Sequence, residues 1–145
     1  MRVHRVIDRE LVLRLARIEE KAYPPAYRYI RSMEDVEELL EYCEASYPDE
    51  LIVLTGDNWY MVINHVSKEV IDWAAAGRLS MADLAKIWRF IKENFDELHM
   101  DAREKTSYKI MKVFEGRGRI EILHDSSWTW AGEIFHHVHI RIKSS

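Results

Sequence analysis

Cysteine and long apolar runs are scarce in this 145-residue chain, and each shortage argues against a class of protein. The single Cys43 excludes an intramolecular disulfide and argues against a cysteine-based zinc site, which favours a reducing, cytoplasmic setting. No segment approaches the ~20 apolar residues that cross a bilayer, and the first ten residues lack the apolar core of a signal peptide. Lysine and arginine together number 21 against 25 acidic residues, and this balance argues against nucleic-acid binding by bulk charge.

Apolar residues make up 48% of the chain, which is enough for a sizeable core in one domain over residues 1–145. Periodicity predicts helices capped by Asp8, Ser32 and Ser80 and a fourth helix over 106–114. Alternation and turn signals predict strands over residues 1–7, 51–54, 59–63, 69–75, 98–102, 119–123 and 133–142. The expected fold class is therefore α/β (α+β), with a single mixed, mostly antiparallel sheet flanked by helices.

The order of these elements is strand, two helices, three strands, helix, strand, helix and two strands. Two segments add to this pattern: an acidic stretch, an aromatic residue and a proline over 17–24, and an aromatic turn over 114–118. The chain thus resembles the GNAT superfamily of N-acetyltransferases over nearly its whole length. The resemblance implies that acyl-CoA lies where the fourth strand splays from the fifth, so a cleft between Ala74 and Leu98 would favour an enzyme.

The resemblance also implies a loop that binds the pyrophosphate of acetyl-CoA or another acyl-CoA at a helix N-terminus. The corresponding cofactor-binding positions in this chain are Gly77, Arg78, Leu79, Ser80, Met81 and Ala82. Met81 and Asp83 stand where the family has small residues, and they would oppose close approach of a phosphate. The alternative interpretation is an ordinary strand–turn–helix connection with a good cap.

Asp72 is the candidate catalytic base, because it lies inside the apolar run of residues 70–74 and burial would raise its pKa. The alternatives are that Asp72 pairs with Arg103 or Lys68, or faces solvent. The family's proton-donating tyrosine corresponds to Phe114. Tyr108 is a poor substitute, since six residues place it about 240° around an ideal helix from that position.

Three further groups invite a functional interpretation. Trp128 and Trp130 lie near the tip of the last hairpin, in a turn expected over 126–130, and would either bind a partner or pack onto the sheet. His137 and His139 share one strand face, while His136 points away from it. Glu133 or Asp125 could add a third zinc ligand, but the spacing fixes none and we predict no metal site. The glutamates of the second helix form an acidic face that is either solvated or partner-binding.

Two hypotheses therefore remain open. The first is an acyl-CoA-dependent N-acyltransferase with Asp72 as base and an acceptor that the sequence does not name. The second is a non-catalytic GNAT-like domain, compatible by resemblance with a phage origin, that acts by protein binding. A homodimer through Trp128 and Trp130 is compatible with both hypotheses.

Overall fold

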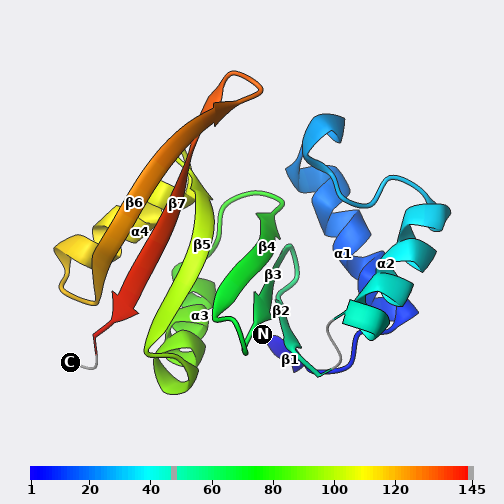
Figure 1. The fold of residues 1–145 in the computed structure, drawn as a ribbon, viewed down its shortest axis with the longest axis horizontal. Helices are drawn as coiled ribbons and strands as arrows, with labels where there is room; N and C mark the ends of the chain where they lie inside the picture. Colours follow the sequence, from blue (N-terminus) through cyan, green and yellow to red (C-terminus); the bar gives the residue numbers. More distant parts are fainter. Residues whose placement is uncertain (47–48, 144–145) are drawn as a thin grey trace. The chain divides into compact units, whose positions relative to one another are not determined.

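The structure, a computed structural model, describes residues 1–46 and 49–143 of the chain (Figure 1). Its helices are α1 Arg9–Ala22, the 3-10 turn η1 Pro25–Tyr27, α2 Met33–Ser46, α3 Met81–Asn94 and α4 Ser107–Gly116. Its strands are β1 Arg2–His4, β2 Leu51–Thr55, β3 Trp59–Asn64, β4 Glu69–Ala75, β5 Glu97–Arg103, β6 Ile120–Trp130 and β7 Glu133–Ile142. Within these residues no helix combines the length and apolar content that crossing a membrane requires.

The strands form one seven-stranded sheet in the order β1-β2-β3-β4-β5-β7-β6. The β1–β2, β2–β3, β5–β7 and β6–β7 pairs are antiparallel. The β4–β5 pair is parallel, with Glu69 opposite His99 and Val70 opposite Met100. The predicted fold class, a mixed and mostly antiparallel sheet flanked by helices, is confirmed.

The chain divides into two compact units. The first comprises Met1–Ser67 and Asp72–Ile87, and the second comprises Lys68–Ile71 and Trp88–Ser145.

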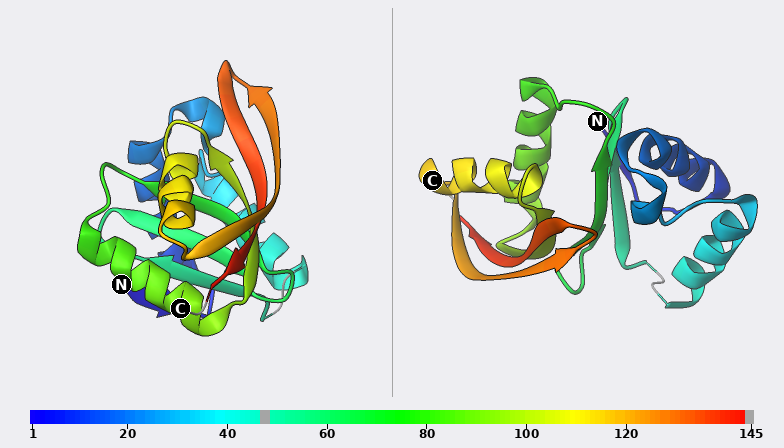
Figure 2. Two further views of the ribbon diagram at one scale, coloured as in Figure 1. Left: turned by 90° about the vertical axis from the view of Figure 1, so that its left-hand side faces the viewer. Right: turned by 90° about the horizontal axis from the view of Figure 1, so that it is seen from above.

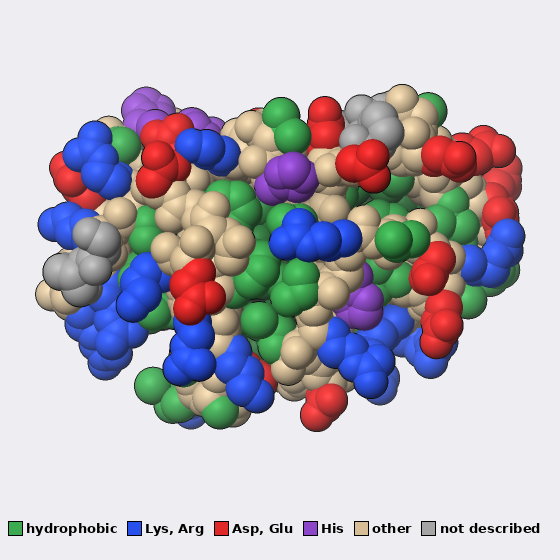
Figure 3. All heavy atoms as spheres, turned by 90° about the horizontal axis from the view of Figure 1, so that it is seen from below, with side chains coloured by type: hydrophobic (Ala, Val, Ile, Leu, Met, Phe, Trp, Pro, Cys, Tyr) green, Lys and Arg blue, Asp and Glu red, His purple; other side chains and the backbone are tan. Residues whose placement is uncertain are grey.

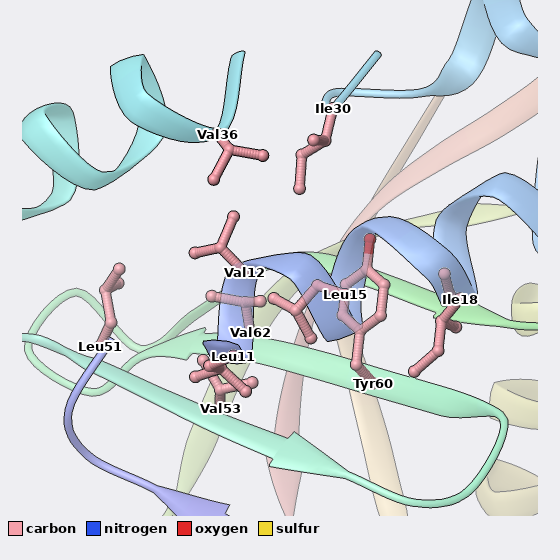
Figure 4. Close-up of a cluster of buried hydrophobic side chains, with 11 residues drawn as sticks. Leu11, Val12, Leu15, Ile18, Ile30, Val36, Leu51, Val53, Tyr60 and Val62 are labelled. Carbon is pink, nitrogen blue, oxygen red and sulfur yellow. The ribbon is translucent and has the colours of Figure 1, made fainter. Parts of the chain in front are cut away.

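The core of the first unit lies between α1, α2 and the strands β2 and β3. The right-hand view of Figure 2 shows both helices on the same side of these two strands. Figure 4 shows Tyr60 of β3 among the apolar side chains of α1, beside Leu15 and Ile18. Val12 is fully buried in the same cluster, and burying a side chain of this size stabilises the fold by about 2 kcal/mol.

The helix starts in the first unit follow the predicted caps. The Asp8 side chain accepts a hydrogen bond from the Leu11 amide at 2.8 Å, and Ser32 accepts one from the Asp35 amide at 3.2 Å. Pro24 and Pro25 follow α1 closely, where their missing N–H groups prevent the helix from continuing. These local signals fix where α1 begins and ends, and therefore which of its residues face the sheet.

The first strand is shorter than predicted. Alternation suggested a strand through Ile7, but β1 ends at His4. It pairs with the last three residues of β2, from Val53 to Thr55, and the chain leaves the ladder after His4 although β2 begins two residues earlier, at Leu51. Val6, which the pattern placed in this strand, is 74% exposed.

In the second unit, α4 packs against β5 and β6, and β6 and β7 form a long hairpin (Figure 2). The turn expected over 126–130 is wrong, since β6 continues to Trp130 and the loop is Ala131–Gly132. Both loop residues have positive φ, 51° and 78°, as a tight two-residue hairpin of the primed type needs. The polar residues before the tip therefore belong to the ladder, and Trp128 and Trp130 are strand residues.

Candidate functional site

Asp72 lies in the middle of β4, on the face that the first unit covers with helices. Side chains two residues apart along a strand share a face, and Ala74 of that face belongs to the buried cluster under α1 and α2. Asp72 itself is half-buried. The strand thus holds a carboxylate at the margin of an apolar core.

The Asp72 carboxyl group is held by a tyrosine. The Tyr60 hydroxyl lies 2.6 Å from Asp72 Oδ2 and 3.1 Å from Glu19 Oε2. Glu19 comes from α1, and its other oxygen accepts the backbone N–H of Ile30 at 2.8 Å. Glu19, Tyr60 and Asp72 therefore form one hydrogen-bonded group, here called the Glu19–Tyr60–Asp72 cluster.

Burial raises the pKa of the Asp72 carboxyl to about 7. The negative charge of Glu19 adds to this increase, while hydrogen bonds from the Tyr60 hydroxyl and the Trp73 amide oppose it. Burial and the two carboxylates together raise the pKa of Tyr60 far above its ordinary value. Tyr60 thus keeps its proton, and Asp72 exchanges its own near neutral pH.

The alternative partners considered for Asp72 are engaged elsewhere. Lys68 donates to Asp96 at 2.8 Å, and Arg103 pairs with Glu133. The two cations therefore stabilise other carboxylates.

The predicted cofactor loop follows β4 within the same unit. Gly77 has a φ of 110°, a conformation that strains any residue with a side chain, so a glycine is needed for the chain to turn there. Arg78 is exposed, and Ser80 caps α3 by accepting the Asp83 amide at 3.1 Å. The prediction that Ser80 starts this helix is confirmed.

The start of α3 offers positive potential to an anion, with one opposing charge. The Ser80 hydroxyl takes the amide of Asp83, while the Arg78 guanidinium and the start of α3 supply positive potential. Met81 is 72% exposed and therefore lies outside the core, where its flexible side chain can move aside. The Asp83 carboxylate in the first turn is the feature that opposes an anion.

The position at which the resemblance implies a proton-donating tyrosine holds a packed phenylalanine ring. Phe114 contacts Trp88 with ring centroids 5.4 Å apart, and the Arg119 guanidinium lies over its face at 5.9 Å. Tyr108 donates to Asp125, and this hydrogen bond raises the pKa of Tyr108 to about 12. Neither residue is a suitable general acid at neutral pH.

The histidines of β7 divide between the two faces of the strand, as predicted. His137 bonds Asp101 at 2.8 Å and His139 bonds Glu97 at 3.3 Å, while His136 stacks on Tyr108. In the part of the chain that the structure describes, no group of three or more metal-ligating side chains is arranged to hold an ion. Each of these two hydrogen bonds joins one ring nitrogen to a separate carboxylate.

Trp128 and Trp130 lie two residues apart in β6 and share a strand face. Both contact Phe135 of β7, with ring centroids 5.6 and 6.1 Å apart. They remain 41% and 49% exposed. The two indoles therefore pack onto the sheet on one side and present an aromatic surface on the other.

The acidic face of α2 is exposed over most of its length. Figure 3 shows acidic side chains gathered at its right-hand edge, on the side where Figure 1 places α2. Glu34, Glu38, Glu41 and Glu44 are exposed, whereas Glu37 pairs with Arg9 of α1. The pairing ties the two helices together.

Two members of the cluster, Glu19 and Tyr60, were not singled out from the sequence. Tyr60 is hidden within a strand that is buried at every position. Glu19 carries a readable signal, because it lies four residues after Leu15 and eight after Leu11, on the apolar stripe of α1. A carboxylate on such a stripe needs a buried partner.

Comparison with protein-family models finds no match, and comparison with curated proteins finds none either. Solved structures do match. The ribosomal-protein-S18-alanine N-acetyltransferase from Escherichia coli is 12% identical, with a TM-score of 0.59 over 99% of this chain and 94% of that protein. A spermidine N-acetyltransferase chimera of Vibrio cholerae SpeG and hSSAT is 13% identical, with a TM-score of 0.56 over 97% of this chain and 96% of that one. The chain therefore has a GNAT-like fold.

Proposed function

We propose that this protein is an N-acyltransferase that uses acetyl-CoA or another acyl-CoA, with Asp72 as the general base. The observation that carries the proposal is the Glu19–Tyr60–Asp72 cluster, which holds a carboxyl group of near-neutral pKa on β4. Both similar solved structures are N-acetyltransferases, whose names give an alanine and spermidine as acceptors. An amine acceptor is consistent with a base of this kind.

Asp72 removes a proton from the acceptor nitrogen, which at neutral pH arrives as an ammonium ion and must lose a proton to become a nucleophile. A carboxylate of ordinary pKa is a weak base, whereas one with a pKa of about 7 is matched to the task. The negative charges of Asp72 and Glu19 also favour a cation over a neutral acceptor.

The exposed Arg78 guanidinium and the amides from Leu79 to Ala82 would hold the cofactor's pyrophosphate. Acyl-CoA, when bound, supplies an activated acyl group on a thiol, and a thiolate is a good enough leaving group to depart without a dedicated proton donor. The packed Phe114 ring is compatible with that chemistry.

Calorimetric titration with acetyl-CoA and CoA tests the proposal with two variants that are expected to change the binding affinity in opposite directions. Arg78→Ala is expected to weaken binding about tenfold, because it removes a cation from the pyrophosphate site. Asp83→Asn is expected to tighten binding about threefold, because it removes a carboxylate from the first turn of α3. Arg89→Ala is the control, because Arg89 lies in α3 about two turns after Asp83, and it should leave binding unchanged. Absence of heat with millimolar ligand in the wild type contradicts the acyltransferase proposal.

A second candidate function is self-association through the hairpin. It is favoured by the exposed Trp128 and Trp130 and by the terminal position of β6 in the sheet order, where an edge strand can pair with a second copy.

The double substitution of Trp128 and Trp130 by serine is expected to convert a dimer to a monomer in sedimentation-velocity experiments. The surface loses most of its apolar area, while the core under α1 is untouched. Tyr42→Ser, an exposed aromatic change on α2, is the control. A wild-type protein that sediments as a monomer at 100 µM (on the order of the weakest useful interface) contradicts this second candidate.

A further inference from the structure

When both carboxyl groups are ionised, the Glu19–Tyr60–Asp72 cluster has one hydroxyl hydrogen for two hydrogen-bond contacts. The Tyr60 hydroxyl carries one proton, yet its oxygen lies 2.6 Å from Asp72 and 3.1 Å from Glu19. Two ionised carboxylates cannot both accept that single proton fully. A second proton on one carboxyl group satisfies both contacts, because Tyr60 can then accept from one group and donate to the other.

The cluster thus has two arrangements. When Asp72 is ionised, the shorter contact indicates that Tyr60 donates to Asp72, and Glu19 keeps the Ile30 amide as its hydrogen-bond donor. When Asp72 is protonated, Asp72 donates to the Tyr60 oxygen and the tyrosine proton turns to Glu19 Oε2. Each arrangement satisfies the Tyr60 oxygen, and rotation of one hydroxyl hydrogen interconverts them once Asp72 has changed its protonation.

Glu19 is fully buried, and its described hydrogen-bond partners are uncharged. Its relative exposure is 0%, and its two oxygens meet an amide and a phenol. A buried carboxylate without a cation is unfavourable for folding, since the Coulombic compensation of an ion pair is missing. Packing alone therefore does not explain a glutamate at this position.

We propose that Glu19 is a positioning residue that acts through Tyr60, whose single hydroxyl proton moves between Asp72 and Glu19 and so sets the proton affinity of Asp72. The proposal deepens the acyltransferase function and rests on it for the kinetic readout. Protonation of Asp72 gains a Tyr60-to-Glu19 hydrogen bond and relieves repulsion between two carboxylates. The ionised state gains the Tyr60-to-Asp72 bond instead.

Three elements of the first unit place groups around Asp72. Glu19 comes from α1 and Tyr60 from β3, while on β4 itself the Trp73 amide contributes a hydrogen bond. Tyr23, at the end of α1, donates to the Trp73 carbonyl at 2.6 Å and fixes the backbone beside Asp72. The charged group among them is Glu19, so it is the group whose neutralisation should move Asp72 most.

Two substitutions are expected to move the pKa of Asp72 in opposite directions. Glu19→Gln removes the negative charge, and the glutamine amide can donate to Tyr60, which then donates to Asp72, so the pKa should fall by about one pH unit. Tyr60→Phe removes the hydrogen bond to the carboxylate, so the pKa should rise by about one pH unit. Glu20→Gln, the same change on the exposed neighbouring residue, and Tyr29→Phe, on an exposed tyrosine, are the matched controls.

The measurement is a carbon-13 NMR titration of aspartate-labelled protein, with the Asp72 resonance assigned from Asp72→Asn. The pH dependence of kcat/KM for acyl transfer is the second readout and should shift with the same sign. Urea unfolding establishes that each variant is folded. If Tyr60→Phe does not fold, Glu19→Gln alone decides the sign, and Glu19→Asp, which keeps the charge, should restore a pKa near that of the wild type.

The possible outcomes distinguish the proposed role of Glu19 from the proposed enzymatic function. Opposite pKa shifts without any acyl transfer support the role of Glu19 and overturn the enzymatic function. Acyl transfer by the wild type, with an Asp72 pKa that Glu19→Gln leaves unchanged, overturns the role of Glu19 and leaves the enzymatic function standing. Shifts of the same sign in both variants also overturn it, because loosened packing alone would move both in one direction.

Discussion

Asp72→Asn is expected to lower acyl transfer by at least about 100-fold while making the folded protein more stable at pH 8. Loss of a general base typically reduces the rate by a factor of about 100 to 10,000. Asparagine keeps the shape of the side chain, and its carbonyl can still accept the Tyr60 hydrogen bond. The expected defect is therefore confined to proton transfer.

The stability gain follows from the raised pKa of Asp72. In the folded state this carboxyl titrates at about 7, compared with its ordinary 3.8, so between about pH 4 and pH 7 the folded protein holds a proton that the unfolded chain does not. The stability that the protonated Asp72 carboxyl contributes is therefore present in full below about pH 4 and is lost as the pH rises through 7. Asparagine is never charged, so the variant should be more stable by roughly 2 to 4 kcal/mol above pH 7.

Urea unfolding of both proteins at pH 5 and pH 8, together with a steady-state acylation assay, provides the measurement. Asp57→Asn, in the exposed turn after β2, is the control and should change neither quantity. A variant that is less stable than the wild type at pH 8 would show that the Asp72 carboxylate supports the fold, and the interpretation of Asp72 as a functional residue would be wrong.

Gly56→Ala is expected to destabilise the protein by about 3 kcal/mol, the largest stability loss predicted for a single methyl group in this chain. A Cβ at Gly56 would lie 1.9 Å from Nε1 of Trp59 and 2.5 Å from its Cε2. Trp59 is 1% exposed, so the indole has no solvent into which to move.

The strain at this turn would reach the candidate site, because Tyr60 directly follows Trp59 in β3. The Gly56 amide donates to the Trp59 carbonyl at 3.0 Å, and the Gly56 carbonyl accepts from Arg14 of α1 at 2.8 Å. A shift of the turn therefore disturbs both the hairpin and its tie to α1. We therefore expect Gly56→Ala to change the pKa of Asp72 as well as to lower the stability of the protein.

Equilibrium urea unfolding followed by circular dichroism measures the effect. Gly116→Ala is a matched control, since a Cβ there meets no atom within 4 Å and the residue lies in α4. That substitution should be neutral or slightly stabilising, because alanine favours a helix more than glycine does. Equal stability of Gly56→Ala and the wild type would contradict the packing of the Trp59 indole over this turn.

Local signals in the sequence were sufficient for most of the fold. Asp8, Ser32 and Ser80 each cap the helix that follows, and a serine or aspartate before an apolar stripe is visible without knowledge of distant contacts. The last hairpin was misplaced for a physical reason. Its Ser- and Thr-containing segment is typical of a turn, whereas the real turn uses Ala131 in a left-handed conformation that no local signal announces.

The candidate site was predicted only in part, because its contacts are distant in the sequence. Asp72 was recognisable as a carboxylate in an apolar run. The Tyr60–Glu19 contact spans 41 residues, and only the folded chain shows that the α1 stripe meets β3 at that point. The partner of Lys68 was equally hidden in the sequence, since this cation bonds Asp96, which lies 28 residues away.

The burial of Glu19 also limits how α1 can lie on the sheet. A rotation of the helix by one residue, about 100°, would carry the carboxylate away from both of its described donors, the Tyr60 hydroxyl and the Ile30 amide. Leucine or isoleucine at this position would tolerate several rotations of the helix. The glutamate therefore specifies a single rotational register of α1, and the residue proposed to control the proton of Asp72 also selects one native packing over its close competitors.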